Sequence, residues 1–131
     1  MNTPFDVQIL WNMPAHAFLA TAKQLCVFQA QNNPVYKQWI ELSNQPITSI
    51  ETINSIPFLP ISFFKNQDVF IGERPAILFE SSGTTQDVVS KHWVTDTNIY
   101  ETSFLQCFER FYGNPNKYCI VGLLPSYLER K

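Results

Sequence analysis

The sequence lacks several features that would each point to a class of function. It contains no run of Lys or Arg and its formal net charge is −2, so a basic surface for nucleic acid is not predicted. No apolar stretch approaches the roughly 20 residues that cross a bilayer. The N-terminus has neither the basic region nor the apolar core of a signal peptide. We therefore expect no nucleic-acid partner and no membrane span.

Cysteine is also scarce. The three cysteines, Cys26, Cys107 and Cys119, are widely spaced and contain no Cys-x-x-Cys pair. An odd, unpaired set favours free thiols in a reducing cytoplasm over a disulfide scaffold or a zinc site. We expect a cytoplasmic chain without a metal-ligand set, in which each of the three thiols is a core residue.

Apolar and aromatic residues are abundant instead. The 131 residues are 45% hydrophobic and 15% aromatic, with eleven Phe, which favours a packed core over disorder. A chain of this length fits one domain that buries about two thirds of its extended surface. So many Phe indicate either an unusually aromatic interior or a surface that contacts further protein.

Residues 1–55 are predicted to be mainly helical. Apolar residues at spacings of three and four indicate a helix from Phe18 to Gln29, with Pro14 near its start. Asn32-Asn33-Pro34 ends this helix, and Pro34 begins a second one. A third short helix is expected at Ser49 to Ser55.

Residues 56–131 are predicted to hold an extended segment, a hairpin, a helix and a buried strand. Pro57 and Pro60 favour an extended chain. We expect the apolar residues of this segment to lie against the core. Lys65, which follows them, is expected at the end of a buried strand. Expected strands are Asp68 to Ile71, Ala76 to Glu80, Val88 to Val94, and Tyr118 to Leu124, the last buried on both faces. A helix follows Asp96 and ends at Gly113. Its apolar face is Tyr100, Phe104, Cys107, Phe108 and Phe111.

The hydroxyl-rich loop between the two middle strands is the most informative motif. Ser81-Ser82-Gly83-Thr84-Thr85 offers hydroxyls, backbone N–H groups and a glycine that allows close approach, which suits a phosphate. It is neither a Walker loop, which needs a second glycine, Lys and a helix, nor a dinucleotide fingerprint, which needs three glycines. The same residue types are also typical of a plain hairpin turn.

Phe79 to Gln86 resembles the signature loop of the adenylate-forming enzymes, the superfamily of acyl-CoA synthetases. Further segments are similar, in the same order, to the N-terminal part of acyl-protein synthetases related to the fatty-acid-activating enzyme of bacterial luminescence. They are Asn33 to Tyr36, Ile56 to Lys65 and Leu123 to Arg130. The resemblance covers nearly all of this chain but about the first third of such an enzyme.

This resemblance implies an α/β fold, with N-terminal helices followed by a mixed sheet and a hairpin phosphate loop. Residues 1–131 would be an incomplete, N-terminal portion of a larger adenylating domain. The implied activity is ATP- and Mg-dependent activation of a fatty or aryl carboxylate, then acyl transfer to a thiol of CoA or protein, with an acyltransferase or reductase as a further partner. The adenine pocket, magnesium-binding acidic residue and catalytic lysine lie downstream in the family, so this chain alone is expected to be inactive.

The resemblance assigns phosphate contact to Ser81, Ser82, Gly83, Thr84 and Thr85. Gln86 departs from the glycine that is frequent in the family, and a left-handed backbone there would be strained. Lys91 could supply a cation and His92 could face the nucleotide. A solvated strand lysine and a structural histidine are the alternatives.

Two other functions stay open: a truncated non-catalytic relative that acts as an interaction module, and a phosphate- or nucleotide-binding domain without acyl chemistry. Whether this chain is itself an enzyme is left open.

Overall fold

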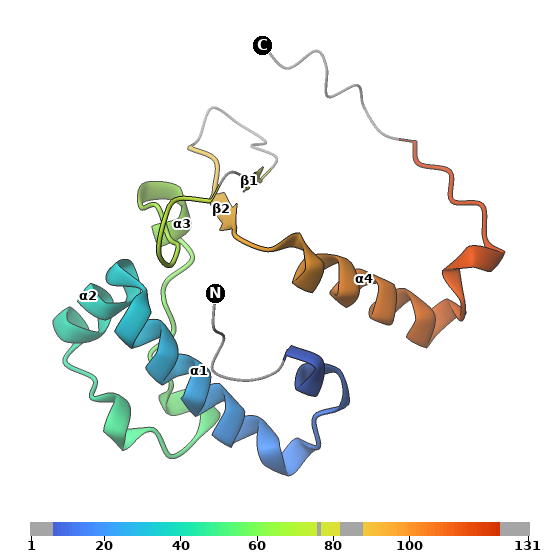
Figure 1. Ribbon diagram of the computed structural model, residues 1–131. Helices are drawn as coiled ribbons and strands as arrows, with labels where there is room; N and C mark the ends of the chain where they lie inside the picture. Colours follow the sequence, from blue (N-terminus) through green and yellow to red (C-terminus); the bar gives the residue numbers. More distant parts are fainter. Residues whose placement is uncertain (1–6, 76, 82–87, 124–131) are drawn as a thin grey trace. The chain divides into compact units, whose positions relative to one another are not determined.

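The computed structural model describes residues 7–75, 77–81 and 88–123 (Figure 1). These residues form a small α/β fold with four α-helices and one two-stranded sheet, divided between two compact units, Met1–Thr97 and Asn98–Lys131. The predicted α/β class is confirmed. The sheet of the described residues is antiparallel, however, and not mixed. No described helix has the length and apolar character needed to cross a membrane.

The first unit is organised around a helix pair, α1 (Phe18–Asn32) and α2 (Pro34–Ser43). Two 3₁₀ turns, η1 (Val7–Asn12) and η2 (Ala15–Ala17), precede the pair. The predicted break between the helices is confirmed and has a local cause. The Asn33 side chain accepts hydrogen bonds from the backbone N–H groups of Val35 and Tyr36, at 3.1 and 3.2 Å. Pro34 occupies the first helical position, where no N–H is needed.

The helix predicted at Ser49 to Ser55 is wrong. Two separate 3₁₀ turns occupy this region, η3 (Ile47–Ser49) and η4 (Ile53–Ser55). Thr52 between them is extended, with φ −134° and ψ 164°. The Ser55 hydroxyl accepts from the N–H groups of Glu51 and Thr52. Serine side chains that bond nearby backbone in this way compete with helix formation.

The apolar segment after η4 is only partly buried. Pro57 is buried and Leu59 packs against the core, but Phe58 and Ile61 remain 64% and 80% exposed, contrary to prediction. The chain then turns into a short helix, α3 (Phe63–Asn66), instead of staying extended. Lys65 therefore lies exposed on a helix and not at the end of a buried strand. The predicted strand at Asp68 to Ile71 is also absent from the described chain.

The hairpin is confirmed with shorter strands. Strand β1 (Ile77–Glu80) pairs antiparallel with β2 (Lys91–Val94), in the register Ile77 opposite Val94 and Glu80 opposite Lys91. The second strand thus begins three residues later than the predicted Val88. Ala76, the predicted first residue of the first strand, lies outside the described residues.

The core of the first unit is small. Cys26, Tyr36 and Ile50 are 5%, 7% and 1% exposed. Half-buried apolar side chains surround them, namely Leu19, Ala30, Trp39, Ile40, Ile47, Ile56 and Leu59. The helix pair and the chain that follows it therefore meet at one cluster, which fixes the start of the segment that leads to α3 and the hairpin.

The second unit consists of α4 (Thr97–Tyr112) and the chain after it. Gly113 has a φ of 79°, and its N–H donates to the Glu109 carbonyl at 2.9 Å, so the predicted glycine stop is confirmed. A 3₁₀ turn, η5 (Pro115–Lys117), follows. Tyr118 contacts the end of α4, where its hydroxyl donates to the Tyr112 carbonyl at 2.6 Å.

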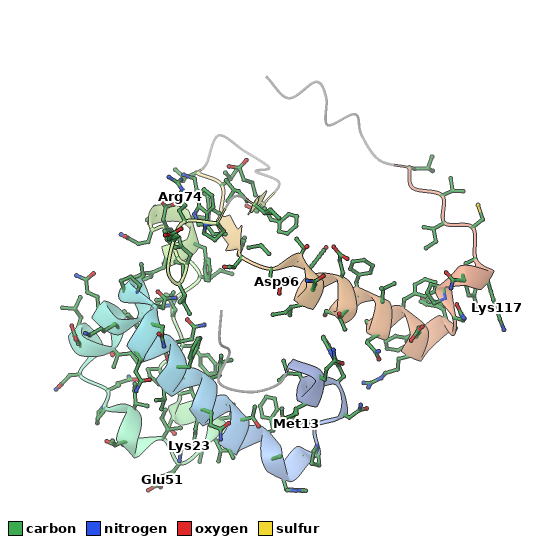
Figure 2. All side chains as sticks on the ribbon, viewed as in Figure 1. Met13, Lys23, Glu51, Arg74, Asp96 and Lys117 are labelled. Atoms are coloured by element: carbon green, nitrogen blue, oxygen red, sulfur yellow. The ribbon has the colours of Figure 1, made fainter. Side chains whose placement is uncertain are left out.

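The predicted buried strand at Tyr118 to Leu124 is wrong over its described part. Residues 118–123 form no strand and are exposed, with Val121 at 80% and Leu123 at 98%. A strand needs a neighbour to take up its backbone hydrogen bonds, and none of the described residues pairs with this segment. Cys107 and Cys119 are exposed and not core residues, whereas buried Cys26 confirms its prediction. The aromatic face of α4 is largely exposed as well (Figure 2).

Replacing Asn33 by Ala should lower the free energy of unfolding by about 1–2 kcal/mol, because two helix N–H groups lose their acceptor. Urea denaturation followed by circular dichroism measures this change. Asn54→Ala is the matched control, because Asn54 is an exposed residue of η4, and should change stability by less than about 0.5 kcal/mol. Equal losses in the two variants would contradict the capping role of Asn33.

Candidate functional site

The hairpin holds the two ends of the predicted phosphate loop together. Beyond the last strand pair, the Ser81 N–H donates to the Ser90 carbonyl at 3.1 Å, and the Ser90 N–H donates to the Ser81 hydroxyl at 3.0 Å. Ser90 is buried. A hydroxyl can accept one bond and still donate its own hydrogen. Ser81 is therefore bonded to Ser90 beyond the last strand pair, and its hydroxyl hydrogen can still be donated to another group.

The other residues assigned to the loop, Ser82, Gly83, Thr84 and Thr85, lie outside the described residues, as does Gln86. Their assignment to phosphate stays a prediction. The described hairpin brings Ser81 together with Lys91 and His92 at its loop end, because Glu80 is opposite Lys91 and Phe79 is opposite His92.

Lys91 and His92 have different surroundings. Lys91 is half-buried and directly opposite Glu80 across the sheet, a cross-strand pairing of opposite charges that is mildly favourable. His92 is exposed, and its ring stacks on Phe64 of α3 with centroids 4.9 Å apart and planes 22° apart. The stacking gives His92 a structural contact that attaches the hairpin to α3.

A second cation lies beside the hairpin and was missed from the sequence. The Arg74 guanidinium is 4.1 Å from the centre of the Trp93 ring and 3.8 Å from the Asp68 carboxylate (Figure 2). The Trp93 indole N–H also donates to Asp68, at 3.1 Å. Arg74 is 59% exposed, so the ion pair itself adds little stability. These contacts hold the Arg74 guanidinium against Trp93 of β2. No residue spacing in the sequence predicts them.

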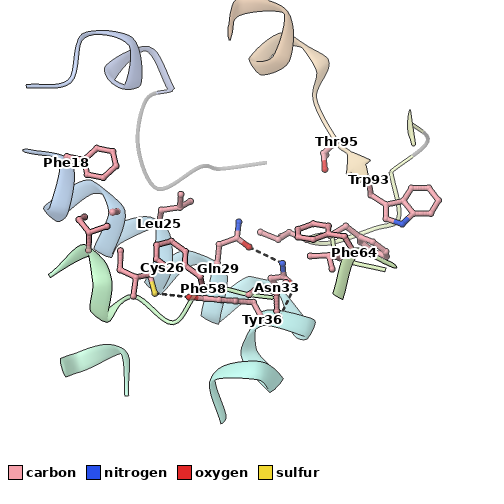
Figure 3. Close-up of a pocket in the computed structure, with 17 residues that line it drawn as sticks. Phe18, Leu25, Cys26, Gln29, Asn33, Tyr36, Phe58, Phe64, Trp93 and Thr95 are labelled. Carbon is pink, nitrogen blue, oxygen red and sulfur yellow. Dashed lines mark hydrogen bonds between the residues drawn. The ribbon is translucent and has the colours of Figure 1, made fainter. Parts of the chain in front are cut away.

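Tyr36 links the helix pair to the following chain through its hydroxyl. The hydroxyl donates to the Pro57 carbonyl at 2.9 Å. It also lies 3.2 Å from the Cys26 sulfur (Figure 3). Because a carbonyl can only accept, the tyrosine hydrogen goes to Pro57. The Cys26 thiol must then donate to the tyrosine oxygen. Burial, and then the contact with Cys26, raises the pKa of Tyr36 well above its usual range.

An apolar cleft opens in the first unit between α1, the chain around Pro57, α3 and β2 (Figure 3). Its volume is about 620 Å³, and its lining includes Cys26, Gln29, Asn33 and Tyr36. Six aromatic rings contribute to the wall, those of Phe18, Tyr36, Phe58, Phe64, Phe70 and Trp93. No pattern in the sequence predicted this cleft. The positions 18, 22, 25, 26 and 29 of α1, which line it, have a spacing that predicts a helix but not a cleft.

Within residues 7–75, 77–81 and 88–123, no group of three or more His, Cys, Asp or Glu side chains could hold a metal ion. No such cluster among the described residues can be assigned to the magnesium that the resemblance implies. Comparison of the chain with models of protein families, with curated proteins and with solved structures finds no match.

Tyr36→Phe should lower the free energy of unfolding at neutral pH by about 1–2 kcal/mol, because the buried Pro57 carbonyl loses its donor. The pKa of Tyr36 is raised by folding, so the unfolded chain loses this proton first, near pH 10. The stabilisation is fully present below about pH 10 and falls as the pH rises beyond it.

The measurement is the urea midpoint of both proteins between about pH 8 and pH 11. Wild type should lose stability more steeply than Tyr36→Phe at the alkaline end. Tyr112→Phe, at an exposed tyrosine, is the control and should follow wild type. Parallel curves for wild type and Tyr36→Phe would show that the raised pKa of Tyr36 is not coupled to folding.

Proposed function

We propose that this chain supplies the phosphate-binding wall of an ATP-dependent ligase that activates a carboxylate and passes the acyl group to a thiol. The observation that supports it best is the reciprocal pair between Ser81 and Ser90, which closes a hairpin directly at the resembled loop. The two strands that flank the loop in the sequence are paired antiparallel, which supports the proposal.

In the proposed reaction, a carboxylate oxygen attacks the α-phosphorus of ATP and forms the acyl-adenylate. The bond from this phosphorus to the bridging oxygen breaks, and pyrophosphate leaves with the electron pair. A thiol then displaces AMP. Hydrogen-bond donors fixed around the leaving pyrophosphate stabilise the charge that develops on it. The hydroxyls and N–H groups of Ser81 to Thr85 would have this role.

Positive charge near the loop end would come from Lys91. It is the first residue of β2 and follows the Ser81–Ser90 pair. Its half-buried position opposite Glu80 restrains it more than a fully solvated lysine. Magnesium, when bound with ATP, would neutralise phosphate charge. No described residue is assigned to hold it.

A non-catalytic interaction module is the second candidate function, and the second unit favours it. Apolar side chains are exposed along α4 and the chain after it, among them Phe104, Phe111, Ile120, Val121 and Leu123. Exposed apolar groups gathered in this way are typical of surfaces that contact other protein. This alternative requires no phosphate binding.

The full chain should bind pyrophosphate and ATP with a measurable heat. Thr84→Val and Thr85→Val should each weaken pyrophosphate binding by about tenfold or more, because a hydrogen bond to a charged ligand is lost. Titration calorimetry at one fixed salt concentration measures both affinities, since contacts with phosphate depend on ionic strength.

Thr48→Val is the matched control, because Thr48 is exposed in η3 and far along the chain from the loop. It should leave both affinities unchanged. Equal affinity in wild type, Thr84→Val and Thr85→Val would remove the loop from the phosphate role. Absence of any pyrophosphate binding by the full chain would favour the interaction module.

A further inference from the structure

The apolar cleft of the first unit has the dimensions of a small-molecule site. Its volume of about 620 Å³ falls within the range of roughly 300–1,000 Å³ that is usual for ligand pockets. It uses none of the residues assigned to the phosphate loop. A ligand in the cleft would therefore be independent of the proposed ligase function.

The wall of the cleft determines the charge of its occupant. None of the seventeen residues that line it within the described chain carries a charge. A charged group moved into such surroundings loses its hydration without gaining an ion pair. The part of a ligand that enters the cleft must be uncharged. Aromatic side chains on several sides favour a flat aromatic body, which they can meet by stacked or edge contacts.

One polar group in the wall has a fixed orientation and an unused donor. The Asn33 side-chain oxygen already accepts from two backbone N–H groups, so its other side-chain atom must be the amide nitrogen. This nitrogen donates to Gln29 at 3.1 Å, which identifies the facing Gln29 atom as its oxygen (Figure 3). The Gln29 amide nitrogen is then left without a partner among the described residues.

Two other polar groups of the wall, the Tyr36 hydroxyl and the Cys26 thiol, are already used. The Tyr36 hydroxyl donates to Pro57, and the Cys26 thiol donates to the Tyr36 oxygen. Neither group is available to a ligand as a free donor. Gln29, half-buried on α1, keeps an unused donor beside them that would give a bound molecule its orientation.

We propose that the cleft binds an uncharged aromatic molecule that carries one hydrogen-bond acceptor, with its rings among the aromatic side chains and its acceptor toward the Gln29 amide nitrogen. The apolar wall supplies most of the affinity and Gln29 supplies selectivity for the acceptor. A second copy of this chain and an acidic aromatic ligand are the alternative occupants, and the experiment below separates them.

The probe is 2-propionyl-6-dimethylaminonaphthalene, an uncharged fused-ring ketone whose emission shifts to shorter wavelength when water is excluded. Titration with the full chain should give saturable binding of one probe per chain. The analogue without the ketone should bind more weakly by roughly threefold to tenfold, because one hydrogen bond is missing. The analogue with a carboxylate in place of the propionyl group should bind more weakly than the ketone, because its charge would lose hydration in the cleft.

Three variants locate the bound probe. Ala22 lines the cleft, whereas Ala20 is an exposed residue on the same helix. Ala22→Phe should therefore weaken binding on the order of tenfold by filling the cavity, and Ala20→Phe should leave it unchanged. Gln29→Glu keeps the acceptor for Asn33 but removes the donor, so it should reduce affinity for the ketone more than for the ketone-free analogue.

Circular dichroism shows whether each variant folds, and the comparison of the two ligands in Gln29→Glu remains informative even if Ala22→Phe does not fold. No saturation, equal effects of Ala20→Phe and Ala22→Phe, or equal loss of both ligands in Gln29→Glu would overturn the proposal. So would tighter binding of the carboxylate. Sedimentation that shows a dimer broken by Ala22→Phe would assign the cleft to a second copy of the chain and also overturn it.

Discussion

The hydrogen bond from the Tyr36 hydroxyl to the Pro57 carbonyl joins the helix pair to everything that follows it in the first unit. Tyr36 is buried beside Cys26 and Ile50 in the same small cluster. Ile56 and Leu59, on either side of Pro57, pack against this cluster, so the hydrogen bond and the apolar contacts together hold Pro57. From Pro57 the chain leads to α3, whose Phe64 stacks on His92 of the hairpin. The position of the hairpin thus depends on a contact made by a helix earlier in the chain.

The same arrangement creates both candidate sites of the first unit. The hairpin carries the resembled loop beyond the Ser81–Ser90 pair, while its residue Trp93 closes one side of the apolar cleft. Phe64 contributes to the cleft and contacts His92. Strand β2, which follows the resembled loop in the sequence, therefore also contributes to the apolar cleft. Their proposed ligands differ in charge, and each can be tested without the other.

Local interactions explain which parts of the fold could be predicted. Asn33 and Pro34 end one helix and begin the next through contacts within a few residues, and Gly113 ends α4 through its own backbone. The strand predicted from Tyr118 onward is wrong over its described part, because periodicity alone cannot show whether a partner strand is present. Ser55 broke an expected helix by bonding to nearby backbone. The cleft and the contacts of Arg74 join residues that are distant in sequence, so no local pattern could predict them.

The most direct test of the proposed phosphate role is the amide nitrogen–proton spectrum of the full chain, titrated with pyrophosphate. We predict that the largest shifts belong to the N–H groups of Ser81, Ser82, Gly83, Thr84 and Thr85, because backbone donors around an anion change their hydrogen bonds when it binds. Shifts confined to scattered Lys and Arg positions, or an unchanged spectrum at saturating pyrophosphate, would contradict the proposal that this hairpin holds a phosphate.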